Sequence, residues 1–388
     1  MKSFKILWFN WRCIKHPLAG GAEVYTHEIA KRLVKRGYEV ILVTSKPDNL
    51  AKQEIIDGYK VIRAGNKYTV YLCARQIYRR FKKNGWKPDI IIDEVNTIPF
   101  LTPKYVAEPI VMLIHQLCKE CWSYAIHPLA QPIGWWLERS LHRTYIKSIK
   151  NGKVGSVITV SDSTKQDLVN LGYPADVVHI VYNGLDWELY RSLDASSREN
   201  DEKENLCVYI GRITPYKNLE DLLEAWKIIE QEEDEPKLII AGRAERKYLE
   251  KLRRIARELG LERIRFMINI SQQEKLHLLR KAKALVYTSV REGWGQTVLE
   301  AAACKTPTIA YNVPGLRDSV KHMETGLLVE LGNIQELAES MELLLKDDEL
   351  REELSKNAAK WAEQFSWDKT AKEFEKSLEV ILTGEENF

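Results

Sequence analysis

The stretch that decides the fold is an apolar run at residues 284–288, followed by Glu292-Gly293-Trp294-Gly295-Gln296-Thr297-Val298-Leu299-Glu300 and then by Ala301-Ala302-Ala303-Cys304. The apolar run predicts a buried strand, and the small residues at its far end predict a helix. The two glycines between them predict a loop. A strand, a loop and a helix in this order form the repeating unit of a parallel sheet covered by helices.

The same alternation extends outward through the whole chain. In the second half, strands are predicted at 206–210, 237–241, 263–267, 284–288 and 306–310, and helices at 218–230, 246–259 and 272–281. In the first half, strands are predicted at 5–9, 39–44, 89–93, 110–114, 156–160 and 177–181, and helices at 22–36 and 163–171. The pattern predicts an α/β fold of two doubly wound, Rossmann-like domains facing each other across a ligand-binding cleft.

The boundary between the halves follows a turn, Tyr182-Asn183-Gly184-Leu185-Asp186. The polar run at 196–205 has no apolar period and is expected to be a solvated linker or loop. A chain of 388 residues is also too long for one ordinary domain. We therefore expect an N-terminal domain at 1–185 and a C-terminal domain at 186–367.

Charge is distributed unevenly over these halves. Up to Leu185 the chain has 27 Lys and Arg against 15 Asp and Glu, whereas the remainder has 31 against 40. A basic half beside an acidic half suggests that the two domains meet different partners.

The composition of the chain also indicates in which cellular compartment the protein is expected. No stretch has the 18–20 apolar residues of a spanning helix, and the first 13 residues read as a strand rather than as a signal peptide. Six scattered cysteines form no disulfide framework, which favours a reducing, cytoplasmic setting.

One group of residues has the composition of a zinc site. His115, Cys118, Cys121 and His127 give H-x2-C-x2-C-x5-H within one aromatic stretch. Structural zinc sites usually join two separated ligand pairs, so unrelated thiols in a packed region are the favoured interpretation, and no metal is expected.

Two loops have the composition of phosphate-binding segments. Gly211-Arg212 and Lys217-Asn218 follow the first strand of the second half and place two cations at the top of a sheet, where they could neutralise a diphosphate. The alternative is a solvated turn whose Asn218 caps the next helix. Gly20-Gly21-Ala22-Glu23 opens the first helix, and glycines there let backbone N–H groups approach an anion, although such a pair is often only a turn.

The two carboxylates of the opening stretch are candidate sugar ligands. Glu292 can accept hydrogen bonds from sugar hydroxyls, while Glu300, just over two helical turns away and expected on roughly the same face, can hold a ribose diol. Two carboxylates could instead be the acid/base pair of a glycoside hydrolase. A hydrolase, however, does not need a loop with Arg and Lys for phosphate.

Taken together, these pieces resemble the retaining nucleotide-sugar glycosyltransferases of the GT-B fold (glycosyltransferase group 1, family 4-like). The matching segments occur in the family's order between residues 5 and 330: Gly20–Glu23, Ile158–Ser163, Tyr182–Asp186, Gly211-Arg212, Lys217-Asn218, Glu292–Glu300, Pro307, Val313–Asp318 and Glu324–Val329.

The resemblance implies a role for each matching residue. Arg212 and Lys217 are similar to the diphosphate clamp, Glu300 to the ribose ligand and Glu292 to the residue that reads the donor sugar. Backbone N–H groups of the loop contact sugar and phosphates, and His115 stands beside the donor sugar. The expected catalytic residues are thus His115, Arg212, Lys217 and Glu292, and the expected donor-binding residues are Gly20, Gly21, Arg212, Lys217, Asn269, Ile270, Glu292, Gly293, Trp294, Gly295, Gln296, Thr297 and Glu300.

The chain departs from the family's pattern at two positions. Ile268 stands where a glycine is usual, next to the stretch from Asn269 to Ser271 that flanks the nucleobase, so the base is left open. Lys305 also replaces a frequent glycine. The family's last helix, here 368–388, packs back on the N-terminal domain.

The implied reaction retains the anomeric configuration through a front-face attack, with a nucleotide-diphosphate sugar as donor substrate and no cofactor. It needs stabilisation of charge more than a protein base. No Asp-x-Asp motif is present, so metal-independent turnover of a hexose-type sugar is expected. Two alternatives remain: a nucleotide-sugar-binding protein without transferase activity, and a sugar-nucleotide epimerase.

The acceptor is predicted from residues 118–150. Tryptophans and tyrosines at 122, 124, 135, 136 and 145 alternate there with Lys and Arg at 119, 139, 143, 147 and 150. Rings with flanking cations suit a membrane surface, which predicts peripheral binding to the cytoplasmic face of a membrane and a lipid-linked glycan acceptor. The alternative is a helix packed on its own domain with the tryptophans in the core. No nucleic-acid-binding module is recognisable.

Overall fold

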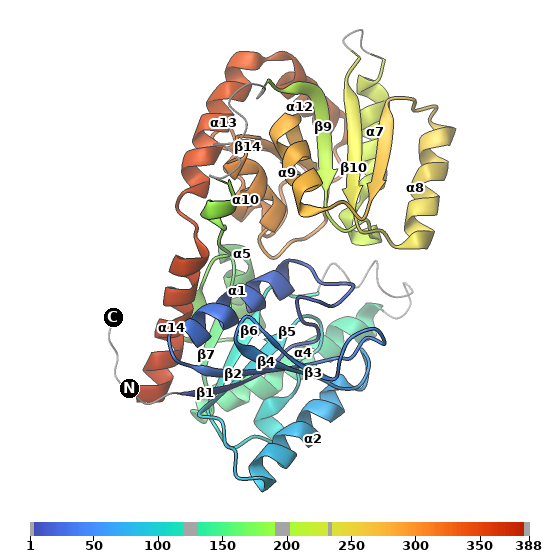
Figure 1. The fold of residues 1–388 in the computed structure, drawn as a ribbon. Coiled ribbons are helices and arrows are strands. Elements are labelled where there is room, and N and C mark those ends of the chain that lie inside the picture. The colour runs from blue at the N-terminus through green and yellow to red at the C-terminus, as the bar shows by residue number, and fades with distance from the viewer. Residues whose placement is uncertain (1–3, 119–130, 191–201, 232–234, 384–388) are drawn as a thin grey trace. The chain divides into compact units, whose positions relative to one another are not determined.

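The computed structural model of the chain describes residues 4–118, 131–190, 202–231 and 235–383 (Figure 1). Its contacts divide the chain into two compact units. Unit 1 comprises Met1–Gly184 and Trp367–Phe388, and unit 2 comprises Leu185–Ser366. Each unit is built on one parallel or mostly parallel sheet, which confirms the prediction of two Rossmann-like halves.

Unit 1 has an eight-stranded sheet in the order β3-β4-β2-β1-β5-β6-β7-β8. All neighbouring strands are parallel except β3 and β4. The strands are β1 (Lys5–Phe9), β2 (Glu39–Thr44), β3 (Gln53–Ile56), β4 (Tyr59–Arg63), β5 (Ile90–Val95), β6 (Ile110–Ile114), β7 (Val154–Thr159) and β8 (Val178–Ile180). The helices are α1 (Gly21–Lys35), α2 (Val70–Lys83), α4 (Gln131–Lys150), α5 (Asp162–Leu171) and α14 (Trp367–Thr383), with short 3-10 turns η1 (Thr102–Lys104) and η4 (Ala175–Val177).

The last helix closes unit 1 rather than unit 2. Helix α14 packs beside α1, where Figure 1 shows the two together. The ring of Phe374 stacks on Trp8 of the central strand β1 at 5.4 Å, and Asp368 binds the guanidinium of Arg32 at 2.6 Å. The C-terminal helix thus completes the core of the N-terminal unit.

Unit 2 has a six-stranded parallel sheet in the order β11-β10-β9-β12-β13-β14. The strands are β9 (Glu204–Ile210), β10 (Lys237–Gly242), β11 (Ile264–Ile268), β12 (Ala282–Tyr287), β13 (Thr308–Tyr311) and β14 (Gly326–Val329). The helices are α7 (Leu219–Ile229), α8 (Arg246–Glu258), α9 (Gln272–Lys281), α10 (Gln296–Ala303), α11 (Leu316–Ser319), α12 (Ile334–Lys346) and α13 (Asp348–Ala362), with a 3-10 turn η5 (Pro215–Lys217). The strand order reverses between β9 and β12, where the loops that follow these two strands meet.

Several elements were not predicted from the sequence. The hairpin of β3 and β4 turns at Asp57-Gly58, where both residues have positive φ, and this pair is itself a hairpin signal. Strand β14 and helices α2 and α11–α13 were also not predicted. In contrast, the predicted polar loop at 196–205 was wrong at its end, because Glu204 and Asn205 belong to β9; residues 191–201 lie outside the described part of the chain.

Within the described residues, no helix is long and apolar enough to cross a membrane.

Candidate functional site

The site in unit 2 starts from Lys217, which ends the 3-10 turn after β9. Its side chain is 5% exposed, and its ammonium pairs with the carboxylate of Glu292. The ammonium also lies 4.9 Å from the ring centre of Tyr216 and 5.1 Å from that of Tyr287. Burial alone would lower the pKa of Lys217, but the attraction of Glu292 and the tyrosines outweighs it, so the net pKa lies above its ordinary value. Lys217 is therefore a fixed positive charge.

Hydrogen bonds join the Lys217 loop to the loop that follows β12. The hydroxyl of Thr288 donates to the carbonyl of Lys217 at 2.9 Å, and the N–H of Val290 donates to the carbonyl of Tyr216 at 3.1 Å. Since β9 and β12 are neighbours in the sheet, their carboxyl ends bring the two loops together. Two segments that are 75 residues apart thus form one rigid surface.

A third loop, which follows β13, contacts the backbone of Glu292. The N–H of Glu292 donates to the carbonyl of Pro314 at 3.1 Å. The next residue, Gly315, has φ +83°, and a Cβ there would lie 2.2 Å from the carbonyl oxygen of Glu292. Only glycine fits this approach, which explains why Val313–Asp318 belongs to the motif set.

Glu300 lies on helix α10 and has its own lysine. Both oxygens of its carboxylate accept from the ammonium of Lys275 on α9, each at 2.8 Å. The expected common helical face for Glu292 and Glu300 is wrong: α10 begins only at Gln296, after Gly295, whose φ of +90° turns the chain. The left-handed turn places Glu292 in the loop, so the two carboxylates meet different cations.

Arg212 differs from Lys217 in exposure. Its side chain lies at the surface, where its Nη2 donates to the hydroxyl of Tyr216 at 2.7 Å. Its carbonyl accepts from the hydroxyl of the buried Tyr209 at 2.8 Å, which fixes the backbone at this residue. The Arg212 guanidinium is therefore accessible from solvent, whereas the Lys217 ammonium is buried.

The rest of the predicted loop provides backbone and packing. Trp294 is buried with its ring 5.3 Å from that of Phe365, so its side chain belongs to the core. Gln296 and Thr297 are the first two residues of α10, where the backbone N–H groups point out of the end of the helix. Such N–H groups and the helix dipole favour a negative charge there.

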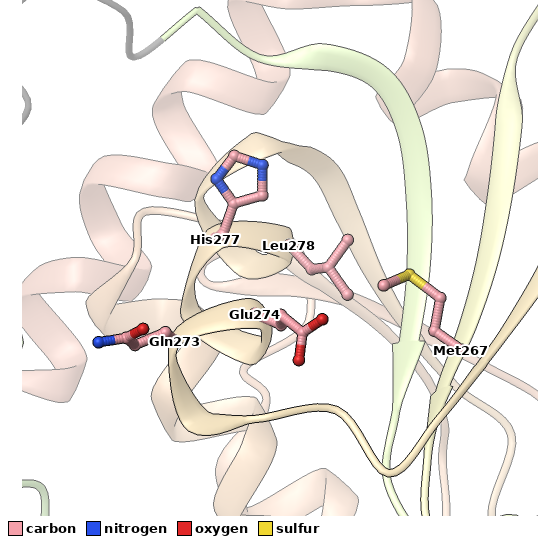
Figure 2. A pocket seen from close by; sticks show the side chains of 5 residues that line it. All are labelled: Met267, Gln273, Glu274, His277 and Leu278. Atoms are coloured by element: carbon pink, nitrogen blue, oxygen red, sulfur yellow. The ribbon is translucent and has the colours of Figure 1, made fainter.

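The predicted nucleobase stretch lies at the carboxyl end of β11. Asn269 has φ +59°, and its N–H donates to the carbonyl of Gly242 at 3.0 Å. Close by is a pocket with a volume of about 260 Å³, whose lining residues are Met267, Gln273, Glu274, His277 and Leu278. Figure 2 shows Glu274 and Leu278 pointing toward Met267, while Gln273 points away. Neither Lys275 nor Glu300 lines this pocket.

In unit 1 the predicted residues lie at the carboxyl ends of β1 and β6. Gly20 precedes helix α1, and its N–H donates to Glu23 at 2.6 Å. Arg12 lies 4.0 Å from the other oxygen of Glu23. The backbone N–H of Gly20, which was predicted to bind phosphate, thus already donates to the side chain of Glu23.

His115 follows β6, and its Nε2 lies 3.1 Å from an oxygen of the buried Glu94. The edge of the Tyr25 ring packs on its imidazole at 5.2 Å. The ring is therefore held in place on two sides and is only 12% exposed.

The zinc-like cluster is only partly within the described residues. Cys121 and His127 lie outside them. Cys118 is buried and free of a disulfide, and its thiol lies 3.8 Å from the carbonyl of Asn96. Over residues 4–118 and the other described ranges, no group of three or more metal-ligating side chains is found.

Helix α4 bears on both interpretations of the aromatic segment. Its buried face consists of Gly134, Glu138, His142 and Tyr145. Trp135 and Trp136 are 48% and 66% exposed, so the interpretation that placed them in the core is wrong. Tyr145, by contrast, is a core residue whose hydroxyl donates to Asp93, and it cannot face a membrane. Residues 119–130, with Trp122 and Tyr124, lie outside the described part of the chain.

Two polar residues that contact the predicted site residues, Lys275 and Glu94, were not predicted from the sequence. Lys275 belongs to no recognisable motif, because its partner Glu300 lies 25 residues away in the chain. Glu94 did leave a signal: an acidic pair, Asp93-Glu94, ends a run of three isoleucines in a strand that is buried throughout. Carboxylates at the carboxyl end of a buried parallel strand are candidates for a site.

Comparison with known proteins gives the family. The model described as Glycosyltransferase Family 4 matches residues 19–189, and the model described as Glycosyl transferases group 1 matches residues 191–361. The D-inositol 3-phosphate glycosyltransferase of Jonesia denitrificans is 30% identical, and the alignment covers 91% of this chain and 89% of that protein.

Solved structures show the same fold at lower identity. Sucrose-phosphate synthase from Thermosynechococcus elongatus superposes with a TM-score of 0.80 at 19% identity, over 98% of this chain and all of that one. Anabaena HepE in complex with UDP and glucose superposes with a TM-score of 0.72 at 20% identity, over 97% of this chain and all of that one. With two GT-B-like halves, both family models and a relative at 30% identity, the chain belongs to the group 1 glycosyltransferases.

Proposed function

We propose that this chain is a retaining, metal-independent glycosyltransferase that moves a hexose-type sugar from a nucleotide-diphosphate sugar to an acceptor at a membrane surface. The observation that carries the donor part is the Lys217–Glu292 pair. A buried lysine next to a carboxylate, with the exposed Arg212 on the same loop, combines a ligand for phosphate with a ligand for sugar hydroxyls. HepE, which has this fold, binds UDP and glucose.

The cations take the role of stabilising the departing nucleotide. Lys217 supplies a fixed charge, and Arg212 adds a second charge that can close on the diphosphate. Charge on the leaving oxygen grows in the transition state, so these contacts strengthen as the glycosidic bond breaks. The N-terminus of α10 adds backbone N–H groups. This positive charge performs the work of a divalent metal ion, which is why we expect turnover without one.

The two glutamates divide the donor between them. Glu300 holds the ribose diol, and Glu292 accepts from the hydroxyls of the transferred sugar. Binding of the diphosphate at Lys217 weakens the hold of the ammonium on Glu292, which frees that carboxylate for sugar. The acceptor hydroxyl attacks the face from which the nucleotide leaves, and the departing phosphate takes its proton, so the anomeric configuration is retained.

A donor panel tests this proposal. Thermal shift with UDP, GDP, ADP and their sugars should reveal one nucleotide whose sugar conjugate raises Tm selectively, because a ligand of the native state stabilises it. Incubation of that donor with an acceptor should release nucleoside diphosphate in the presence of EDTA, and the product should keep the anomeric configuration by NMR. Isomerised donor without nucleotide release would indicate an epimerase, and binding without either reaction a regulatory protein.

The acceptor part of the proposal rests on helix α4. The exposed apolar side chains Ile133, Trp135, Trp136 and Leu137 lie at its start. Exposed cations follow along the same helix at Arg139, Arg143, Lys147 and Lys150, and its one carboxylate, Glu138, is buried. An apolar end inserts at headgroup level, while each cation near an anionic surface adds about 1 kcal/mol. We therefore expect peripheral binding to the cytoplasmic membrane face and a lipid-linked acceptor.

Liposome flotation tests the membrane part alone. Wild type should float with anionic vesicles at low salt and less at high salt, because the attraction is screened. Trp135→Ala combined with Trp136→Ala should float poorly. Tyr68→Ala combined with Leu72→Ala is the matched control, since both residues are exposed on unit 1 and neither belongs to α4. Flotation that is equal in the tryptophan variant and in wild type would end this assignment.

A further inference from the structure

A buried polar cluster in unit 1 surrounds Glu94, which ends strand β5 and is 0% exposed. Its Oε2 accepts from the indole Nε1 of Trp8 at 2.8 Å and from the hydroxyl of Thr26 at 2.6 Å. Its Oε1 lies 3.1 Å from the Nε2 of His115. Strands β1, β5 and β6 and helix α1 thus meet at one carboxylate.

The donors around Oε2 are fixed in direction. The indole N–H of Trp8 can only donate. The amide of Asn10 donates to the oxygen of Thr26 at 3.0 Å. The one hydroxyl hydrogen of Thr26 has two acceptors within reach, Oε2 of Glu94 at 2.6 Å and the carbonyl of Ala22 at 3.1 Å, and the Glu94 oxygen is the nearer. Asn10 is itself held by the amide of Asn96 at 2.8 Å. Both donors need an acceptor at Oε2, which leaves Oε1 for the imidazole.

We infer that Glu94 is a positioning residue that holds His115 with its proton on Nε2 and leaves Nδ1 as the acceptor that meets the ligand. Burial raises the pKa of Glu94, and the hydrogen bonds from His115 and Thr26 act against that rise. In the ionised carboxylate, which accepts only, Nε2 must carry the hydrogen between them. The remaining nitrogen then accepts from a hydroxyl group, a chemistry that suits a sugar and not a phosphate oxygen. This inference rests on the proposed function for its ligand, but the proton position is a property of the free protein.

The substitution Glu94→Gln reverses the polarity of this contact. Because Trp8 and Thr26 both donate to Oε2, the amide oxygen must take that position, and the NH2 group then faces His115. An NH2 group donates, so Nε2 becomes the acceptor and the ring proton moves to Nδ1. The size of the side chain is unchanged, and only the direction of one hydrogen bond changes.

The measurement is ring nitrogen NMR on protein labelled at its eight histidines, with His115 assigned from a His115→Gln variant. Wild type should show protonated Nε2 and unprotonated Nδ1, and Glu94→Gln the opposite pattern. In the assay, Glu94→Gln should lower kcat by about 10–100-fold, the usual loss for a displaced orienting partner. The Kd for bare nucleoside diphosphate should not change, because the proposed nucleotide ligands belong to unit 2.

Asp93→Asn is the matched control. Asp93 neighbours Glu94 in the same strand and is equally buried, but its partners are the hydroxyl of Thr102 at 2.6 Å, the N–H of Phe100 and Tyr145. It should lower stability and leave the His115 spectrum unchanged. A wild-type ring protonated on Nδ1, or on both nitrogens, would overturn the inference even if Glu94→Gln failed to fold. If wild type transferred no sugar while the spectrum was as expected, the proposed function would fail and the proton position would stand.

Discussion

The predicted site residues of the two units have different kinds of partner. Unit 2 buries a lysine against a carboxylate, and its second glutamate pairs with Lys275. At the sheet edge of unit 1, the buried Glu94 accepts from Trp8 and contacts His115, and elsewhere in the unit the buried His142 lies 2.8 Å from the hydroxyl of Tyr173. Unit 1 also has an ion pair, between the buried Arg63 of β4 and the partly buried Glu54 of β3. The comparison indicates that the predicted site glutamates of unit 2 are held by lysines, whereas His115 of unit 1 is held by a buried, hydrogen-bonded carboxylate.

The largest expected effect concerns the two cations of unit 2. Lys217→Met and Arg212→Ala should each lower kcat by about 10²–10³-fold, the usual loss of one transition-state charge contact. Lys217→Met should also destabilise the protein, since Glu292, with a side chain only 13% exposed, loses its partner. Steady-state kinetics and thermal melts separate the two effects.

Arg212→Ala serves as the internal control for that experiment, because its exposed side chain should leave Tm unchanged. Full turnover in both variants would contradict the assignment of Arg212 and Lys217 as the ligands of the diphosphate. An equal loss of Tm in both would contradict the contrast between a buried and an exposed cation.

Acid should act on unit 1 first. Burial lowers the pKa of His142 to about 4, and burial also lowers the pKa of His27 and of His179, all in unit 1. The unfolded histidine, with a pKa near ~6.5, takes up a proton that the folded one refuses, so the contribution of these histidines to stability is lost as pH falls from about 6.5 to 4. Burial raises the pKa of Asp93 and of Glu94, and their contribution has the opposite sign. For His142 alone the loss amounts to about 3 kcal/mol.

Hydrogen exchange of peptides from each unit between pH 7 and pH 4 checks this. Protection in unit 1 should fall more steeply than in unit 2, and His142→Gln should flatten the slope. His277→Gln, an exposed histidine of α9, should change neither slope. A parallel fall in both units would contradict the comparison.

The two glutamates of unit 2 should differ in ligand binding. Glu300→Gln should weaken bare nucleoside diphosphate by about 10-fold or more, since a hydrogen bond to a charged group contributes about 1.5–3 kcal/mol. Glu292→Gln should spare the bare nucleotide and impair binding or transfer of the sugar. Calorimetry with nucleotide alone and with the sugar conjugate distinguishes them, and equal losses in both variants would refute the division of roles.

The smallest effect concerns the start of α9. The hydroxyl of Ser271 accepts from the N–H of Glu274 at 3.1 Å, and the Glu274 carboxylate accepts from the N–H of Ser271 at 2.7 Å. Ser271→Ala should therefore lower the free energy of unfolding by about 1 kcal/mol, as for a lost N-cap. Nucleotide affinity should remain within twofold by calorimetry. A large loss of affinity would make Ser271 a nucleobase ligand rather than a cap.

Local patterns in the sequence determined the order of strands and helices and the segments that end at the sheet edges. Apolar runs such as 39–44 and 110–114 were predicted at the bounds that the structure gives, because a buried parallel strand leaves a nearly continuous apolar run. The motif at Glu292–Glu300 was equally visible, since its glycines and carboxylates are adjacent in the chain. Elements without such contrast were missed: β14 has only four residues, and basic side chains make up five of the fourteen in α2.

Only the tertiary structure decided which charges are paired and which faces are covered. Lys217 and Glu292 are 75 residues apart, and Glu94 and His115 are 21 apart. They meet because neighbouring strands of a parallel sheet end at the same edge. The order of the strands in a sheet cannot be predicted from the local periodicity of the sequence. Likewise, Trp136 and Tyr145 are both aromatic residues of helix α4, yet Trp136 is 66% exposed and Tyr145 is 0% exposed. A side chain is buried only where another element packs against its helix face, and that packing depends on residues far away in the chain.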